Sequence, residues 1–170
     1  MTESAQTAEI GLISDTHGLL RPEALAALDG VQHVVHAGDV GPQTIVDTLR
    51  EIAPVTVVRG NTDQGSEALA WPMTAAVEIA GRTFYVVHDI DTLDLDPAAA
   101  GMAAVVYGHS HRPAAAVRED VLYVNPGAAG HRRFSLPVTV ARLRVDGDRL
   151  RLRYCDLTTG DIGPWQDYGV

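Results

Sequence analysis

Residues 9–18 read EIGLISDTHG, and they decide how the fold begins. The apolar side chains among the first six residues favour a β-strand over residues 9–14, and Gly18 lets the chain turn away afterwards. Asp15 and His17 stand between the strand and the turn, separated by one residue. In an extended segment, side chains spaced in this way point to the same side. We therefore expect the carboxylate and the imidazole to reach the same cation.

The same arrangement, a short apolar run followed by metal-binding side chains, recurs four times along the chain. The later groups are Gly38-Asp39, Gly60-Asn61-Thr62-Asp63, His88 and Gly108-His109-Ser110-His111. Carboxylate, imidazole and amide oxygen are ligands of borderline or hard divalent cations. A carboxylate has two oxygens that can each bind a different ion, so Asp39 is the natural bridge. The pattern predicts a two-metal site with seven candidate ligands: Asp15, His17, Asp39, Asn61, His88, His109 and His111.

Apolar runs and turn residues predict the remaining elements of an α/β fold. They are a helix opened by Pro22, a helix from Pro42 to Arg50, a hairpin around Ala80-Gly81-Arg82, and strands over 31–37, 55–59, 103–107, 121–124, 138–145 and 150–155. The alternation of strands and helices in the first third indicates a βαβ start. The hairpin after Ala75 indicates a second sheet.

Chain length and the distribution of small polar residues set the expected boundaries. A chain of 170 residues suits one domain, which we place at residues 9–170. We expect residues 1–8 to be a flexible leader. Residues 158–170, rich in Gly and Asp, are expected to form a surface tail with Trp165 as its anchor.

The formal charge of −9 argues against general binding to nucleic acid or to a membrane surface. The short basic cluster of Arg132 and Arg133 beside His131 is either a phosphate site or a solvated loop face. The single cysteine, Cys155, excludes an internal disulfide and is expected to be structural. We find no secretory signal and no membrane span, so we expect a cytoplasmic protein. The sequence leaves open whether the chain forms homo-oligomers.

The order D-x-H, G-D, G-N, H, G-H-x-H resembles that of the calcineurin-like metallophosphoesterases, from about Ile10 to Pro137. The V-R-G-N-x-D form of the third motif looks like their small bacterial and archaeal phosphodiesterase branch. This resemblance implies two packed β-sheets flanked by helices, a four-layer α-β-β-α sandwich. It also implies that Asp15, His17, Asp39 and His111 bind one metal ion, and that Asp39, Asn61, His88 and His109 bind the other.

The resemblance implies a phosphodiesterase that hydrolyses small phosphate diesters by attack of a metal-bridging hydroxide. Asp39, Asn61 and His109 would then be the catalytic residues. Two divalent ions are expected, manganese first, with iron, zinc or nickel as alternatives. Two other functions stay open. One is a phosphomonoesterase with the same site, and the other is a non-catalytic metal-binding scaffold, like the retromer subunit of this fold.

Several neighbours of the motifs depart from the family pattern or have two interpretations. Thr62 stands where many members carry a histidine, which suggests weaker general-acid help and a bias to good leaving groups. Asp89 replaces a usual glycine and either orients a ligand imidazole or is solvated. Arg59 either pairs with Asp63, which we slightly favour, or faces the substrate phosphate. His36 either supports the metal edge or is a packed strand histidine. Residues 64–73 are expected to form a wall above the metals or a dimer contact.

Overall fold

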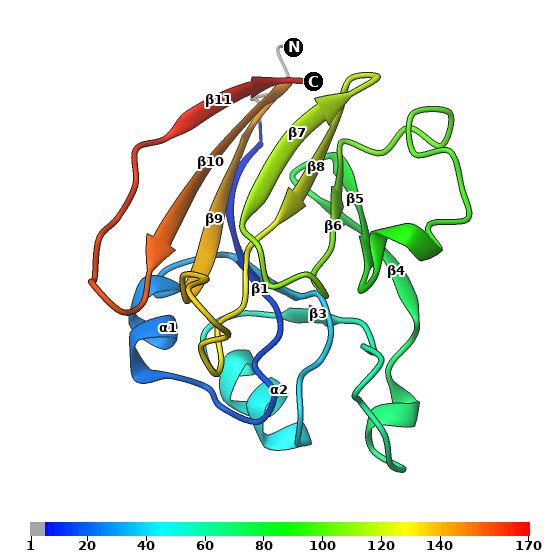
Figure 1. Ribbon diagram of the computed structural model, residues 1–170. Coiled ribbons are helices and arrows are strands. Elements are labelled where there is room, and N and C mark those ends of the chain that lie inside the picture. The colour runs from blue at the N-terminus through cyan, green and yellow to red at the C-terminus, as the bar shows by residue number, and fades with distance from the viewer. Residues whose placement is uncertain (1–5) are drawn as a thin grey trace.

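The computed structural model describes residues 6–170 and contains two mixed β-sheets (Figure 1). The first sheet has the strand order β11-β10-β9-β1-β2-β3. Its strands are β1 (Thr7–Ile13), β2 (His33–His36), β3 (Val55–Val57), β9 (Thr139–Asp146), β10 (Arg149–Asp156) and β11 (Gln166–Gly169). The second sheet has the order β4-β5-β6-β8-β7. Its strands are β4 (Thr74–Ile79), β5 (Arg82–Val87), β6 (Ala104–Val106), β7 (Ala114–Arg118) and β8 (Val121–Asn125).

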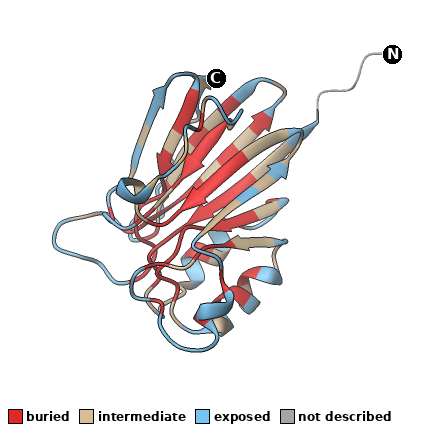
Figure 2. Cartoon of the chain, turned by 90° about the vertical axis from the view of Figure 1, so that its right-hand side faces the viewer, coloured by how far each residue is buried: buried red, intermediate tan, exposed pale blue. Residues whose placement is uncertain are grey.

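The main core lies between the two sheets, as the buried bands along the strands show (Figure 2). Leu12 and Leu143 of the first sheet belong to the same buried cluster as Phe84, Val106 and Leu122 of the second. Each strand contributes alternate residues to this cluster because successive side chains point to opposite faces. The apolar alternation in the sequence therefore predicted these strands well, and the hairpin of β4 and β5 is confirmed.

Two α-helices cover the other face of the first sheet, namely α1 (Pro22–Ala27) and α2 (Gln43–Arg50). Ile45, Val46 and Leu49 of α2 are buried on one side of the helix and pack into a second cluster with Ile13 and Val34. This spacing gives the helix an apolar stripe that faces the sheet. Both helices begin at or just after the expected prolines.

The outer face of the second sheet carries no α-helix within residues 6–170, so the helix-flanked four-layer expectation is met only in part. Residues 89–102, including the 3₁₀ turn η2 (Ile90–Thr92), cover this face and pack Leu93 against Tyr85 and Val87. The segment alternates aspartates with apolar residues, and aspartate side chains favour turns by bonding nearby backbone N–H groups. The Asp89 side chain accepts a hydrogen bond from the Asp91 backbone N–H, and the Asp96 side chain accepts one from the Ala99 N–H. These bonds stabilise turns, so the segment does not form a regular helix or strand.

Three further observations differ from the sequence expectations. β1 begins at Thr7 rather than Glu9, while the first five residues of the expected leader lie outside the described part of the chain. β7 was not expected, because its alanine-rich sequence has little strand preference. The expected surface tail forms β11, which pairs with β10, although Trp165 does anchor it between the guanidinium groups of Arg144 and Arg153.

No helix in the described residues is long and apolar enough to span a membrane.

Strand direction brings the motif loops together. β1, β2 and β3 run parallel in the first sheet, and β5, β6 and β8 run parallel in the second. The carboxyl ends of parallel strands lie at the same edge of a sheet. Backbone bonds join the loops of this edge, from Asp15 N–H to the Gly38 carbonyl (3.0 Å) and from Gly108 N–H to the His88 carbonyl (2.9 Å). These loops carry all seven candidate ligands.

Candidate metal centre

The structure brings all seven candidate ligands to one rim and sorts six of them into two groups of three. Asp15 and His17 follow β1, Asp39 follows β2, and Asn61 follows β3. The remaining three come from the second sheet, His88 after β5 and His109 and His111 after β6. Within each group, one donor atom per side chain lies within 4.8 Å of the others.

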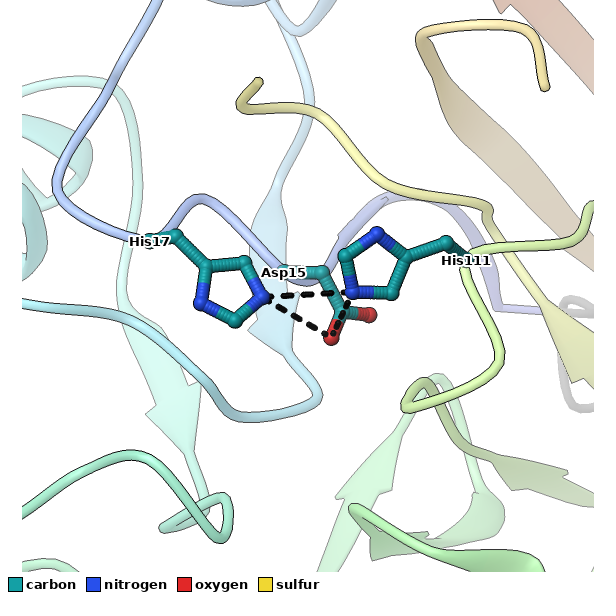
Figure 3. A group of neighbouring side chains, drawn as sticks. All are labelled: Asp15, His17 and His111. Carbon is teal, nitrogen blue, oxygen red and sulfur yellow. Dashed lines mark hydrogen bonds and ion pairs between the residues drawn. The ribbon is translucent and has the colours of Figure 1, made fainter. Parts of the chain in front are cut away.

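The first group consists of Asp15, His17 and His111 (Figure 3). Nε2 of His111 lies 3.3 Å from Oδ1 of Asp15 and 3.2 Å from Nε2 of His17. Asp15 is completely buried, and its Oδ1 atom has no hydrogen-bond partner among the described residues. A buried carboxylate oxygen without a donor is costly, so this atom is poised for a cation.

The second group consists of Asp39, His88 and His109, and Asn61 joins it. Nδ1 of His88 contacts the Ala37 carbonyl at 2.7 Å, and this bond turns Nε2 toward the site. Nε2 then lies 3.2 Å from Oδ2 of Asp39 and 3.1 Å from Oδ1 of Asn61. Nδ1 of His109 also lies 3.1 Å from Oδ1 of Asn61. Oxygen and nitrogen donors from four loops thus face one small space.

One oxygen of Asp39 joins the two groups. Its Oδ1 atom accepts a hydrogen bond from the Thr62 backbone N–H at 2.9 Å. Oδ2 is left to face both sides, at 3.2 Å from Nε2 of His88 and 3.6 Å from Nε2 of His17. The sequence analysis expected one oxygen of Asp39 for each ion, whereas in the structure the Thr62 N–H occupies Oδ1 and Oδ2 alone faces both groups.

Local backbone conformation aims most of these side chains, in a way the sequence argument did not foresee. Asp15, His17, Asp39, His109 and His111 have φ between 45° and 67°, in the left-handed region. The expectation of an extended D-x-H segment is therefore wrong, although the two side chains do converge. Such conformations cost roughly 1–3 kcal/mol each and persist only where surrounding contacts impose them. Here the backbone N–H groups of Asp15 and His17 donate to the loop after β2, and the His109 N–H donates to Oδ2 of Asp15 at 3.2 Å.

His36, on β2, connects two of the loops that carry the candidate ligands. It is fully buried, and its Nε2 lies 3.0 Å from the hydroxyl of Thr16, which itself donates to the Val40 carbonyl at 2.7 Å. Its Nδ1 accepts the Gly38 N–H at 3.2 Å. The ring is therefore neutral with its proton on Nε2, and it connects the loop after β1 to the loop after β2. Of the two interpretations of His36, support of the metal edge fits these contacts.

Ser14 is a supporting residue that the sequence analysis missed. Its hydroxyl donates to Oδ2 of Asp15 at 2.7 Å and orients the carboxylate so that Oδ1 faces the imidazoles. Its position directly before the D-x-H motif is a signal that could have identified it. Asn125, in the Asn-Pro-Gly turn, has a similar role, because its Nδ2 donates to the Gly108 carbonyl at 2.9 Å and to the Ser110 hydroxyl at 3.1 Å.

Close packing makes glycine necessary at two positions of the rim. A Cβ at Gly60 would collide with the Asp39 carboxylate, and a Cβ at Gly108 would collide with the Ser14 hydroxyl and Oδ2 of Asp15. The loops therefore approach each other closely only because these residues have no side chain.

The expected pairing of Arg59 with Asp63 is wrong. The Asp63 carboxylate accepts three backbone N–H groups, those of Val40 (2.9 Å), Gly41 (3.1 Å) and Gly60 (2.9 Å). It thereby closes the turn behind Asn61, as expected for a capping residue. Arg59 instead donates from Nε to the Met73 sulfur at 3.2 Å.

The charges of the site reflect both burial and contact. Burial alone would raise the pKa of the Asp39 carboxyl, but contacts with His88 and the Thr62 N–H outweigh it and hold this pKa well below its usual range. Burial tends to lower the pKa of His88, yet contact with Asp39 and the Ala37 carbonyl raises it overall. Burial lowers the pKa of His17 despite the nearby Asp39 and Asp15. A cation requires deprotonated donors, so the lowered pKa values of Asp39 and His17 favour cation binding, whereas the raised pKa of His88 means that a cation must displace its proton.

The residues present fit a pair of divalent cations. The donors are imidazole nitrogens, carboxylate oxygens and one amide oxygen, a set suited to manganese, iron, zinc or nickel. Oδ1 of Asp15 is an orphaned buried acceptor, and Oδ2 of Asp39 faces both groups. The side chains of His17 and His109 are 21% and 47% exposed, so the centre is open to solvent on their side.

The basic cluster, the cysteine and the strand histidine His33 contribute no ligand to either group. His131, Arg132 and Arg133 are exposed on the loop that follows Gly130, and Arg133 is near enough to His17 for its charge to help lower the pKa of that imidazole. Cys155 is buried in the cluster between the first sheet and the helices, as its expected structural role requires, and burial raises the pKa of its thiol. His33 is half-buried and contacts Thr56 at 2.8 Å on the neighbouring strand.

Comparisons with known proteins point to one family. Residues 9–148 match the model of the calcineurin-like phosphoesterase superfamily domain. A probable metallophosphoesterase of Methanothermobacter thermautotrophicus is 33% identical over 153 residues, which cover 83% of this chain and 88% of that protein. Phosphodiesterase YfcE of Escherichia coli K12 is 29% identical over 157 residues, covering 78% of this chain and 85% of that protein. The structure of vacuolar protein sorting 29 from Cryptosporidium parvum covers 96% of this chain and 99% of its own at a TM-score of 0.80 and 20% identity.

The protein has two packed β-sheets and two adjoining groups of His and Asp side chains on one rim, as expected for a metallophosphoesterase. The chain belongs to the calcineurin-like phosphoesterase superfamily. Its relatives include archaeal and bacterial metallophosphoesterases and YfcE, in agreement with the V-R-G-N-x-D motif.

Proposed function

We propose that this protein is a dinuclear metal-dependent phosphodiesterase that hydrolyses small phosphate diesters. The observation that carries the proposal is the placement of Oδ2 of Asp39 between the two candidate groups, 3.2 Å from His88 and 3.6 Å from His17. A carboxylate in this position would serve both cations. The family relationship and the phosphodiesterase YfcE among the relatives support the same reaction class.

Seven residues would hold the cations. Asp15, His17 and His111 with Asp39 would form one site, and Asp39, Asn61, His88 and His109 the other. Two bound cations, with manganese as the first expectation, supply positive charge for the phosphate oxygens and lower the pKa of the water that serves as nucleophile.

The side chains nearest the reacting phosphate would be Asp39, Asn61 and His109. His109 is the most exposed of the three histidines from the second sheet. Asp89 stands 3.9 Å from Nε2 of His109, and its charge favours the tautomer in which Nε2 carries the proton and Nδ1 faces Asn61. We therefore assign Asp89 the orienting role rather than a solvated one.

Thr62 bears on the choice of leaving group. Its backbone N–H holds Asp39, while the residue itself is exposed and has no side chain that titrates near neutral pH. General-acid catalysis is typically worth about 10²–10⁴-fold in rate. Without a histidine at this position, the enzyme should favour esters whose leaving group needs no proton.

The test uses protein stripped with chelator and then supplied with manganese. Initial rates on bis(p-nitrophenyl) phosphate and p-nitrophenyl phosphate are compared, and we expect manganese-dependent turnover that favours the diester. A preference for the monoester would replace the proposal with a phosphomonoesterase. Absence of turnover with manganese, iron, zinc and nickel would replace it with the scaffold role.

An isosteric pair of variants makes the test specific to the site. Asp39→Asn removes the shared carboxylate charge, and we expect it to abolish both turnover and loading of two ions per chain. Asp47→Asn changes an exposed carboxylate on α2 and serves as the control. Wild-type turnover by Asp39→Asn would show that the site is assigned wrongly.

A further inference from the structure

A cavity of about 300 Å³ opens directly beside the second candidate group. Two of its lining residues, Asn61 and His88, also belong to the metal centre. Ligand pockets for small molecules typically start at about this volume. Its other lining residues are Arg59, Met73, Thr74, Val87, Asp89, Thr92 and Asp94.

Arg59 and Met73 form one wall of this cavity and hold each other in place. The Arg59 backbone N–H donates to the Pro72 carbonyl at 2.8 Å, and its Nε donates to the Met73 sulfur at 3.2 Å. None of the ion pairs within residues 6–170 involves Arg59. Met73 is 58% exposed, a large share for an apolar side chain. A guanidinium plane and a polarisable thioether both pack well against flat rings.

The segment that follows β5 offers hydrogen-bond acceptors to the same cavity. The hydroxyl of Thr92 donates to the Asp89 carbonyl at 2.7 Å, so its lone pairs are free to accept. The carboxylates of Asp89 and Asp94 add further acceptors on the same segment. Hydroxyl groups of a ligand would find partners here.

The charge of the cavity restricts its ligand. Arg59 contributes one positive charge and Asp89 with Asp94 two negative charges, so the pocket itself is not cationic. Apart from the metal ligands, the lining side chains therefore offer no net positive charge to a second phosphate group. An uncharged group that combines a planar ring with hydroxyl groups would match Arg59 and Met73 as well as the acceptors of Asp89, Thr92 and Asp94.

We infer that this pocket binds one organic half of the diester and that it selects a nucleoside, with the base against Arg59 and Met73 and the sugar hydroxyls toward Thr92 and Asp94. This inference rests on the proposed function. The substrate is then a nucleoside phosphate diester, and Arg59 and Met73 determine the specificity for it. Met73 belongs to the segment 64–73, for which the sequence analysis expected either a wall above the metals or a dimer contact.

The experiment compares two diesters with the same leaving group. Thymidine 5′-(p-nitrophenyl) phosphate and methyl p-nitrophenyl phosphate both release p-nitrophenolate, and they differ only in the other half. For the manganese-loaded protein we expect kcat/KM to be at least about tenfold higher for the nucleoside ester, as apolar pockets commonly achieve. Met73→Ala should reduce this ratio toward one. Leu69→Ala, which removes an exposed apolar residue of the same loop outside the pocket, should leave the ratio unchanged.

A conservative variant separates the flat surface of Arg59 from its charge. Arg59→Lys retains the positive charge but loses the guanidinium plane. We expect it to lower the selectivity ratio as Met73→Ala does. Wild-type selectivity in Arg59→Lys would contradict stacking on the base.

A binding measurement distinguishes failure of this inference from failure of the proposed function. Thymidine 5′-phosphate and methyl phosphate are titrated into the manganese-loaded protein by calorimetry. Tighter binding of the nucleotide that is lost in Met73→Ala supports the pocket, even if neither diester is hydrolysed. Manganese-dependent hydrolysis with equal kcat/KM for both diesters, and equal binding of both phosphates, overturns the pocket and leaves the phosphodiesterase proposal standing. Neither binding nor hydrolysis would overturn both.

Discussion

The Nε2 atoms of His17 and His111 lie only 3.2 Å apart, on segments separated by almost a hundred residues. Two imidazole nitrogens at this distance either share one proton or direct two lone pairs at each other. Burial and the neighbouring His111 lower the pKa of His17, even though two carboxylates oppose this effect. A cation between the rings would satisfy both nitrogens and Oδ1 of Asp15.

Metal ions should therefore stabilise the fold. We expect manganese at about 100 times its Kd to add roughly 2.7 kcal/mol to the free energy of unfolding, which thermal unfolding with and without chelator would measure. His111→Ala should lose the share of this gain that comes from the first site, because it removes one of the ligands of that site. His131→Ala, at an exposed histidine, is the control. An unchanged metal-induced shift in His111→Ala would contradict the first site.

We expect a side chain at Gly108 to lower both the stability of the fold and its affinity for metal ions. Gly108→Ala places a Cβ against Ser14 and Asp15, and overpacking of this kind typically costs about 1–3 kcal/mol of unfolding free energy. Metal affinity should fall as well, because the carboxylate of Asp15 must move. Chemical denaturation and metal titration would measure the two effects. Gly169→Ala, at a position with open space around it, should show neither.

His36 should make the metal-free protein less stable in mild acid. Burial lowers the pKa of His36 to about 4, against 6.5 in an unfolded chain, although the nearby Asp15 and Asp63 charges oppose this. As the pH falls from 6.5 to about 4, the unfolded state binds a proton that the folded state refuses, so stability falls. The 2.5-unit difference corresponds to about 3 kcal/mol in total.

Urea unfolding in chelator at pH 7 and pH 5 would measure this loss. His36→Gln should reduce the difference between the two pH values, since the other titrating groups remain. His33→Gln, on the same strand but only half-buried, should reduce it less. Equal pH dependence in the wild type and His36→Gln would contradict the assignment.

Cys155 should be dispensable for catalysis. It packs in the cluster behind the first sheet, and its raised thiol pKa keeps it protonated and unreactive near neutral pH. Cys155→Ala should leave kcat/KM of the manganese-loaded protein nearly unchanged and lower the unfolding free energy by about 1 kcal/mol, as lost core packing usually does. A large loss of turnover without loss of stability would implicate the thiol.

The positions of most strands along the chain and the clustering of the motifs could be predicted, because apolar runs mark the strands and the motifs stand at the ends of those runs. Apolar alternation around Leu12 and Leu143 identified inner strands, and Pro22 and Pro42 marked the helix starts. Parallel strands bring their carboxyl ends to one edge, so placing Asp15 and Asp39 at strand ends was enough to predict that they meet.

Other features depend on tertiary contacts that no local pattern records. β7 and β11 have alanine-rich and polar sequences, and they form strands because β8 and β10 offer unpaired backbone groups. The left-handed conformations of Asp15 and His109 arise from bonds to distant loops. Arg59 was misassigned because Asp63, its sequence neighbour, is already occupied by backbone N–H groups from another loop.

The pairing of β11 with β10 has a consequence for how molecules of this protein behave toward each other. β10 spans eight residues, and half of them pair with β11, from Arg149 opposite Gly169 to Leu152 opposite Gln166. Without β11, this long strand would present a free hydrogen-bonding edge, the usual template for strand addition by another chain. The polar strand β11 therefore satisfies the backbone groups of Arg149–Leu152 and becomes the outer strand of the sheet in place of β10.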